Sequence, residues 1–405
     1  MQSLTELYKA GRGPSSSHTM GPDRAARRFL AAYPTADAFA VTLYGSLAKT
    51  GRGHGTDRVL QEAFAPLPLS LSFDEVTADL PHPNTMDLTA LRKGEVLGRW
   101  RVMSVGGGTI EVEGQPAATP PDIYPHSTFA DIAAHCKTHE LRLWEYVAQV
   151  EGEGIWDFLF EIWQTMQNCI KQGLLSMGTL PGGLDIERRA YSLYHGGHMD
   201  ESAATRENRL ICAYAFAAGE QNAGGGTVVT APTCGACGVL PAVLLYTQQT
   251  RGTSDSQVLR ALATGGLMGN LIKTNASISG AECGCQAEIG SACSMAAAAL
   301  AEFYDMSLDQ IEYSAEIAME HHLGLTCDPI WGLVQIPCIE RNAVAAMRAL
   351  NAVRLANFLT NSRKISFDMV VETMYQTGLD MSHQYKETSE GGLAKLYPRP
   401  PVPGR

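Results

Sequence analysis

The sequence predicts an α+β protein of two domains, an α/β domain over residues 1–125 and an all-helical domain over residues 126–405. Strand-like and helix-like patterns alternate in the first third of the chain, and a segment rich in proline and alanine follows at 114–125. Beyond it, apolar residues recur at the three- and four-residue spacing of helices. The length of 405 residues also exceeds what one small core requires.

The first domain is expected to hold a short helix, two strands and a hairpin. Alternating apolar and polar residues mark the strands, and Gly106 to Gly108 mark a tight connection between the last two. The expected elements are a helix at 24–33, strands at 38–45 and 68–73, and a hairpin formed by 95–105 and 108–113. The segment 114–125 is then a linker.

Helical periodicity accounts for most of the second domain. The expected helices are 129–149, 155–174, 204–219, 256–273, 287–304, 307–322, 339–358 and 365–377. The alanine run at 296–299 needs close neighbours on several sides, so its helix is expected in the middle of the bundle.

Composition narrows the classes of partner. The chain has 42 acidic and 31 basic residues, a formal charge of −11, which argues against nucleic acids and anionic membranes as partners. The N-terminus lacks the apolar core of a signal peptide, and no apolar run approaches the ~18 residues that span a bilayer. A cytoplasmic protein acting on small molecules is expected, with its ten cysteines as free thiols or metal ligands.

Seven of the ten cysteines lie between Cys234 and Cys338, mostly beside glycine, proline or serine. Thiolates held on turns suit an iron–sulfur cluster or zinc. Three thiolates, from Cys285, Cys327 and Cys338, can hold a [4Fe-4S] cluster with one open iron that acts as a Lewis acid toward substrate. The pairs CGAC (234–237) and CGC (283–285) equally permit zinc or a redox dithiol.

Three polar segments are candidates for substrate contacts. The segment GPSSSHT (13–19) contains Ser15, Ser16, Ser17, His18 and Thr19 before a helix, either as an anion cradle or as a helix-capping turn. His54, on the glycine-lined loop GHGTD (53–57), is a general base or a surface histidine. Before the CGC pair, Lys273, Asn275 and Ser277 either orient a zwitterion or complete a helix end.

Taken together, these motifs resemble those of the bacterial iron–sulfur-dependent L-serine ammonia-lyases, or serine dehydratases, in their single-chain form. The likeness runs nearly end to end. The residues that carry it are GPSSSHT (13–19), GHGTD (53–57), VTAPT (229–233), NASISGAE (275–282), GCQ (284–286), GLTCDP (324–329) and PCIERN (337–342). The resemblance implies an N-terminal domain similar to the allosteric substrate-binding domain of phosphoglycerate dehydrogenase and a helical domain that carries the cluster.

The resemblance also assigns roles. Cys285, Cys327 and Cys338 match the three cluster ligands, and His54 matches the catalytic base. Ser15 to Thr19 match the serine-rich segment near the substrate, while Lys273, Asn275 and Ser277 lie in the stretch before the first ligand. The implied reaction converts L-serine to pyruvate and ammonium without pyridoxal phosphate, in a homodimer.

Two departures from the family pattern bear on the cofactor. Family members commonly end in a cysteine that reaches back to the cluster, whereas this sequence has no cysteine after YKETSEGGLA (385–394), so water is the expected fourth ligand at rest. Cys234 and Cys283 stand where relatives usually carry asparagine and an apolar residue, and we expect both to be free thiols. Two alternatives remain open: a related lyase acting on L-cysteine or L-threonine, and an amino-acid-binding regulatory protein with a structural metal.

Overall fold

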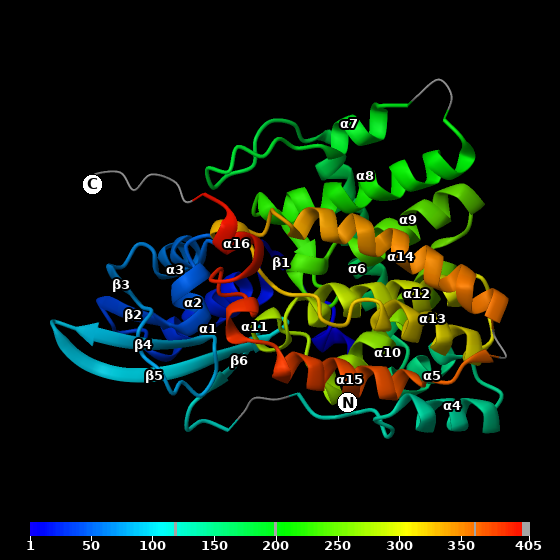
Figure 1. Cartoon of the computed structure of the whole chain (residues 1–405). Coiled ribbons are helices and arrows are strands. Elements are labelled where there is room, and N and C mark those ends of the chain that lie inside the picture. The colour runs from blue at the N-terminus through cyan, green and yellow to red at the C-terminus, as the bar shows by residue number, and fades with distance from the viewer. Residues whose placement is uncertain (117–119, 198–200, 360–361, 399–405) are drawn as a thin grey trace.

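A computed structural model describes residues 1–116, 120–197, 201–359 and 362–398. A sheet with its own helices packs beside a larger helical body (Figure 1), which confirms the predicted α+β class. Of the predicted linker, residues 117–119 lie outside the described part. Among the described helices, none is both long enough and apolar enough to span a bilayer.

The sheet of the first domain has five strands in the order β3-β2-β4-β5-β6. Strands β2 and β3 are parallel, and the other neighbours are antiparallel. The strands are β2 (Ala38–Tyr44), β3 (Leu69–Asp74), β4 (Thr85–Arg92), β5 (Glu95–Gly106) and β6 (Thr109–Val112). The predicted strands and hairpin are confirmed, and β4, which the sequence reading missed, lies at the centre.

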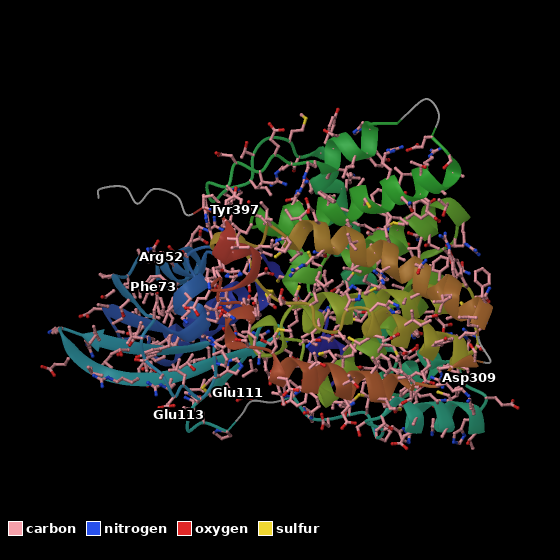
Figure 2. The ribbon with its side chains drawn as sticks, viewed as in Figure 1. Arg52, Phe73, Glu111, Glu113, Asp309 and Tyr397 are labelled. Carbon is pink, nitrogen blue, oxygen red and sulfur yellow. The ribbon has the colours of Figure 1, made fainter. Side chains whose placement is uncertain are left out.

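Three helices, α1 (Gly21–Ala32), α2 (Gly45–Thr50) and α3 (Thr56–Phe64), accompany the sheet (Figure 1). Phe29 of α1 packs edge-on against Trp100 and Phe39, so aromatic rings join helix and sheet. At the rim of this domain, the Arg52 guanidinium lies 4.1 Å above the ring of Phe73 (Figure 2). The contact of Arg52 with Phe73 joins β3 to the turn between α2 and α3, which carries His54.

The first residues of the chain pack mainly with the helical body, although Lys9 also donates to Thr109 of β6 over 3.1 Å. Leu4, Leu7 and Tyr8 belong to the helical core. The short strand β1 (Ala10–Arg12) pairs antiparallel with β7 (Thr227–Val229) of that body. The chain then returns to the sheet through the π-helical turn η2 (Ser16–Met20), which therefore lies at the junction of the two parts.

The helical body is built around α12, in which every residue is buried. This helix packs against α9, α10, α13 and α14, as its alanine run predicts. The helices of the body are α4 (Phe129–Thr138), α5 (Leu143–Glu151), α6 (Gly154–Leu175), α7 (Ala190–His195), α8 (Ala203–Ala223), α9 (Val239–Arg251), α10 (Asp255–Asn275), α11 (Gly280–Cys283), α12 (Ser291–Phe303), α13 (Leu308–Glu320), α14 (Cys338–Leu359), α15 (Phe367–Asp380) and α16 (Gly392–Leu396).

The predicted single helix over 129–149 is wrong, because the chain forms α4 and α5 with a break between them. Glu140 adopts a left-handed φ of 54° at the break. The side chain of Glu145 then accepts a hydrogen bond from the backbone N–H of Arg142 over 2.8 Å, which caps the start of α5. The other predicted helices are confirmed within a few residues at each end, except that 287–304 begins with a π-helical turn, η4 (Gln286–Gly290).

Candidate active site

Three cysteines from separate segments line one small cavity. Cys285 immediately precedes η4, Cys327 lies in the loop after α13, and Cys338 begins α14. His54 and Ser15 from the first domain line the same cavity. The structure therefore brings the three predicted metal ligands and the predicted base together at the junction of the two domains.

The three thiols differ in acidity. A hydrogen bond from Cys327, helped by the nearby positive charge of Arg341, lowers the pKa of Cys285 to about 6 against the effect of burial. The same hydrogen bond and burial raise the pKa of Cys327 well above its usual value. Burial and the charge on Cys285 also raise the pKa of Cys338. Of the three thiols, Cys285 therefore ionises most readily, and a bound metal would displace the protons of the other two.

Arg341 ties two of the ligand-bearing segments together. It lies one turn into α14 from Cys338, and its guanidinium donates to the carbonyl of Thr326 over 2.6 Å and to Asp328 over 3.1 Å. These acceptors flank Cys327. The motif PCIERN (337–342) contains this arginine, but the sequence alone gave it no role, because its burial beside Cys327 depends on the fold.

His54 is buried and held in one tautomer. Its Nδ1 lies 3.0 Å from the carbonyl oxygen of Thr50, which can only accept, so Nδ1 carries the hydrogen and Nε2 has a free lone pair. Burial lowers the pKa of His54 to about 4. On the same turn, a Cβ at Gly53 would lie 2.5 Å from the backbone of Gly332, so glycine lets the helical body close on this loop.

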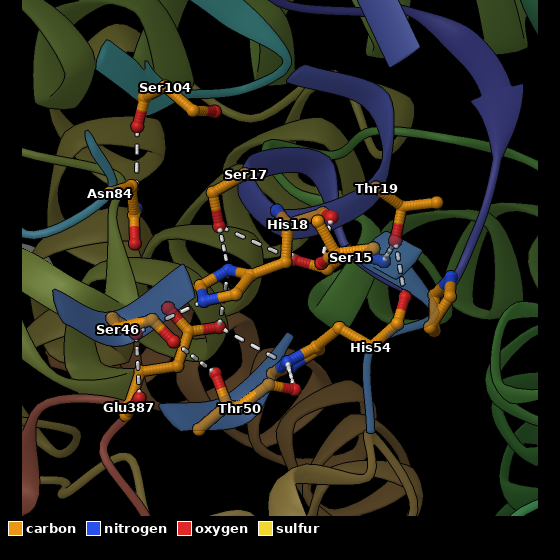
Figure 3. A network of polar contacts seen from close by, with 12 residues as sticks. Ser15, Ser17, His18, Thr19, Ser46, Thr50, His54, Asn84, Ser104 and Glu387 are labelled. Carbon is orange, nitrogen blue, oxygen red and sulfur yellow. Dashed lines mark hydrogen bonds and ion pairs between the residues drawn. The ribbon is translucent and has the colours of Figure 1, made fainter. Parts of the chain in front are cut away.

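His18 stacks against His54, with 4.4 Å between the ring centroids (Figure 3). Its Nε2 lies 3.0 Å from the hydroxyl of Ser46, which donates to the carbonyl of Glu387, so His18 Nε2 donates. Its Nδ1 then accepts from Ser17 over 2.9 Å. Burial and the proximity of His54 lower the pKa of His18 well below its usual value. His18 is therefore a neutral support for the His54 ring.

The serine-rich segment mainly builds this support. Ser15 caps η2 by accepting from the backbone N–H of His18 over 3.1 Å, and it is the member of the segment that lines the cavity. Thr19 donates to the carbonyl of His54 over 2.8 Å. Ser16 and Ser17 are buried, and neither lines the cavity.

Lys273, Asn275 and Ser277 do not line the cavity. The Lys273 ammonium donates to the side chain of Gln2 and to the carbonyl of Glu6 over 3.0 and 3.1 Å. Asn275 donates to the carbonyl of Ser127 over 2.7 Å, and Ser277 donates to Glu282 over 2.6 Å. Their hydrogen bonds hold the segment that leads to Cys285 in place.

Glu387 is a cavity residue that sequence reasoning missed. Its backbone N–H donates to the carbonyl of Cys327 over 2.9 Å, while the N–H of Cys327 donates to Tyr385 over 2.8 Å. One carboxylate oxygen lies 3.6 Å from both His18 Nδ1 and His54 Nε2 (Figure 3). Burial, together with the charges of Glu288 and Cys285, raises the pKa of Glu387 well above its usual value.

One further grouping is a candidate for metal binding. The ligand atoms of His18, His54 and Glu387 lie within 4.8 Å of one another, but Ser17 and Ser46 already occupy both ring nitrogens of His18. In the thiol set, the sulfurs of Cys285 and Cys327 interact with each other. A second acid, Glu288, lines the thiol side, where burial and the charge on Cys285 raise its pKa to about 8.

Neither Cys234 nor Cys283 lines the cavity. The Cys234 thiol contacts the sulfur of Met20 at 3.3 Å. Cys283 packs so closely against α15 that a Cβ at Gly378 would lie 2.6 Å from its sulfur. Both are buried thiols in this structure.

Fold and site together define a class of protein in which a small α/β domain supplies histidines to a thiol-lined cavity of a helical domain. The sequence matches the family models described as serine dehydratase alpha chain, over residues 101–394, and serine dehydratase beta chain, over residues 3–63. The chain belongs to the serine dehydratase family.

Similar proteins match nearly the whole chain. The chain is 41% identical to the L-serine dehydratase of Haemophilus influenzae, over 97% of this chain and 99% of that protein. It is 40% identical to L-serine dehydratase 2 of Escherichia coli and 41% identical to the L-serine dehydratase of Streptomyces coelicolor. Each of these alignments covers 97% of this chain and 98% of the relative.

Proposed function

We propose that this protein is an L-serine ammonia-lyase that converts L-serine to pyruvate and ammonium. The names and full-length similarity of its relatives support the substrate and the reaction. The observation that carries the proposal is the juxtaposition of a neutral histidine, with its Nε2 lone pair free, and three thiols around one cavity. Elimination of water needs both a base for the Cα proton and help for the departing hydroxide.

We further propose that Cys285, Cys327 and Cys338 hold a [4Fe-4S] cluster. Their donor set fits, because three soft sulfur ligands converge in a buried site and one of them already has a depressed pKa. Three protein ligands leave a fourth coordination position, and when bound the cluster supplies a Lewis acid for the substrate hydroxyl. Zinc remains the alternative for the same thiols.

His54 removes the Cα proton in this mechanism. Thr50 holds the ring so that the basic nitrogen is Nε2, and burial keeps that nitrogen unprotonated at neutral pH. General-base help of this kind typically contributes ~10²–10⁴-fold to the rate. Loss of the proton and of hydroxide leaves aminoacrylate, which tautomerises to an imine that water hydrolyses to pyruvate and ammonium. These steps need no pyridoxal phosphate.

The other predicted site residues are proposed to bind or position groups without taking part in the bond changes themselves. Ser15 faces the cavity and can donate to a substrate oxygen, whereas Ser16, Ser17, His18 and Thr19 hold the turn and the His54 ring. Lys273, Asn275 and Ser277 are proposed to fix the chain leading to Cys285. A cytoplasmic homodimer stays a prediction, and sedimentation of the purified protein tests the dimer.

Anaerobic purification tests the proposal directly. The protein is expected to be brown, to contain iron and sulfide in equal amounts, and to form pyruvate from L-serine. Cys327→Ala should lose the colour and the activity, whereas Cys237→Ala, a buried thiol outside the cavity, should keep both. A colourless preparation that turns over L-serine would refute the cluster.

Two outcomes would favour the alternatives. Binding of L-serine without pyruvate, in a protein that contains zinc and no sulfide, would support an amino-acid-binding regulatory protein. Faster turnover of L-threonine or L-cysteine would indicate a related lyase, because one methyl group or a sulfur atom changes binding by only ~1–3 kcal/mol.

A further inference from the structure

The charges that line the cavity are unevenly distributed. Two carboxyl groups, those of Glu288 and Glu387, line it together with the three thiols, and among the described residues no lysine or arginine does. A zwitterionic substrate brings one positive and one negative group into this space. A buried charge needs a partner of opposite sign. Among the described residues that line the cavity, the two acids are therefore side-chain partners for an ammonium group, whereas a carboxylate would find only the hydroxyl of Ser15 and a metal bound by the thiols.

The two acids occupy different sides. An oxygen of Glu288 lies on the thiol side, where it and the Cys327 sulfur both approach Gly280. Glu387 lies on the histidine side, 3.6 Å from Nε2 of His54. The α-ammonium of an amino acid is bonded to the same carbon that loses its proton to His54. Of the two acids, Glu387 is therefore the one beside the place where that ammonium must lie.

Glu387 is held there by its backbone. It has a left-handed φ of 58°, a conformation that costs a residue with a side chain free energy and persists where the surroundings enforce it. The pair of backbone hydrogen bonds with the Cys327 segment provides that enforcement. The backbone of Glu387 is thus fixed relative to the Cys327 segment. A bound ammonium would favour the ionised form of the Glu387 side chain, which burial and the nearby negative charges disfavour.

A role in orienting the His54 ring does not explain why Glu387 lies beside it. The neutral His54 carries its hydrogen on Nδ1, which donates to Thr50, so Nε2 has no hydrogen to give to Glu387. At 3.6 Å, the carboxylate oxygen and the lone pair of Nε2 face each other without a hydrogen bond. A third group with N–H donors fits between them and the substrate carbon, and an ammonium has three such donors.

We propose that Glu387 forms an ammonium subsite that receives the α-ammonium of the substrate and so selects α-amino acids over α-hydroxy acids. The inference rests on the proposed lyase activity, since it places the substrate carbon at His54. It predicts that the enzyme distinguishes L-serine from L-glycerate, which has the same carbon skeleton with a hydroxyl in place of the ammonium.

The test compares these two ligands on the full-length, cluster-loaded protein. Dissociation constants come from titrations followed by electron paramagnetic resonance of the reduced cluster, and KM and inhibition constants come from pyruvate formation. Wild-type protein should bind L-serine at least ~10-fold more tightly than L-glycerate. Glu387→Gln should weaken L-serine by ~10- to 10²-fold and leave L-glycerate nearly unchanged, as expected for loss of a charged hydrogen bond.

Two further variants sharpen the comparison. Glu387→Asp keeps the charge and should retain a preference for L-serine. Glu390→Gln removes a carboxylate from the same segment, where Glu390 is half exposed and paired with Lys49, and should bind both ligands as wild type does.

Each possible result tests either the proposed ammonium subsite or the proposed activity. Equal binding of both ligands by wild-type protein, or an undiminished preference in Glu387→Gln, would overturn the subsite. If Glu387→Gln fails to take up iron and sulfide, the ligand comparison in wild-type and Glu387→Asp protein still decides. Wild-type protein that carries a cluster and discriminates the two ligands but forms no pyruvate would instead refute the proposed activity.

Discussion

The side-chain oxygen of Gln286 accepts a hydrogen bond from the backbone N–H of Gly324 over 2.9 Å. In the opposite direction, the backbone N–H of Gln286 donates to the carbonyl of Leu325 over 3.1 Å. Gln286 follows Cys285 directly, and Gly324 and Leu325 lie just before Cys327. This fully buried glutamine therefore sets the separation of two proposed cluster ligands.

Replacing Gln286 with leucine should loosen the metal site. The side chain also donates to the carbonyl of Met374 over 3.1 Å, so the change removes two side-chain hydrogen bonds to the backbone. Each contributes ~0.5–1.5 kcal/mol. We expect a lower midpoint in urea unfolding and a faster loss of iron after addition of a chelator. Gln172→Leu, at an exposed position, should behave as wild type. Unchanged chelation kinetics in Gln286→Leu would contradict this role.

The lowered pKa of His54 predicts how kcat/KM falls at acidic pH. Burial lowers the pKa of His54 from 6.5 to about 4. The base acts unprotonated, so kcat/KM should fall as the pH falls through that pKa, with a midpoint below 6.5. The measurement is kcat/KM for L-serine under anaerobic conditions, with the absorbance of the cluster followed at each pH. His321→Gln, on a half-exposed histidine, should leave the profile unchanged. A midpoint above 6.5 would rule out His54 in this environment as the base.

The two unusual cysteines should be dispensable for the metal. Cys234 contacts Met20 and Cys283 contacts α15, and neither lines the cavity. We expect Cys234→Asn and Cys283→Val to retain wild-type iron and sulfide content after anaerobic purification. The matched change Cys285→Val should reduce both. Loss of iron in either of the first two variants would identify that cysteine as a ligand.

Hydrophobic periodicity and motif spacing predicted much of the architecture. Helices with one polar face were recognised, but α9 was missed because its residues from Val239 to Leu245 are all buried and show no period. The loop sequences around Cys285 and Cys327 identified the thiol site because few other structures need cysteine beside glycine and proline. These signals are local in the chain.

The acids of the site could not be found in the same way. Glu387 lies among polar residues and resembles a surface acid until the segment after α15 pairs with the Cys327 loop and buries it. Lys273 shows the converse difficulty, since a lysine at a helix end near the motif predicted a substrate contact. The fold instead places the first residues of the chain beside it. Such burial depends on contacts between distant segments, which one sequence does not reveal.

Lys273 should therefore matter for stability more than for substrate binding. Lys273→Met removes the two hydrogen bonds to Gln2 and Glu6, and we expect a loss of ~1–3 kcal/mol in the free energy of unfolding at alkaline pH, where the buried amine carries no charge. The KM for L-serine should change by less than ~3-fold, because this side chain does not line the cavity.

The pH dependence of stability provides an independent check on Lys273. Burial, followed by the charge of Lys9, lowers the pKa of Lys273 from 10.5 to about 8. Between these values the unfolded chain binds more protons at this residue than the folded one, so it contributes stability that rises with pH and is lost as pH falls toward 8. Other groups, such as the buried thiols, also titrate in this window, so the quantity to measure is the difference in unfolding free energy between wild-type protein and Lys273→Met, which should rise with pH. A KM raised by more than ~10-fold, with unchanged stability, would return Lys273 to the substrate site.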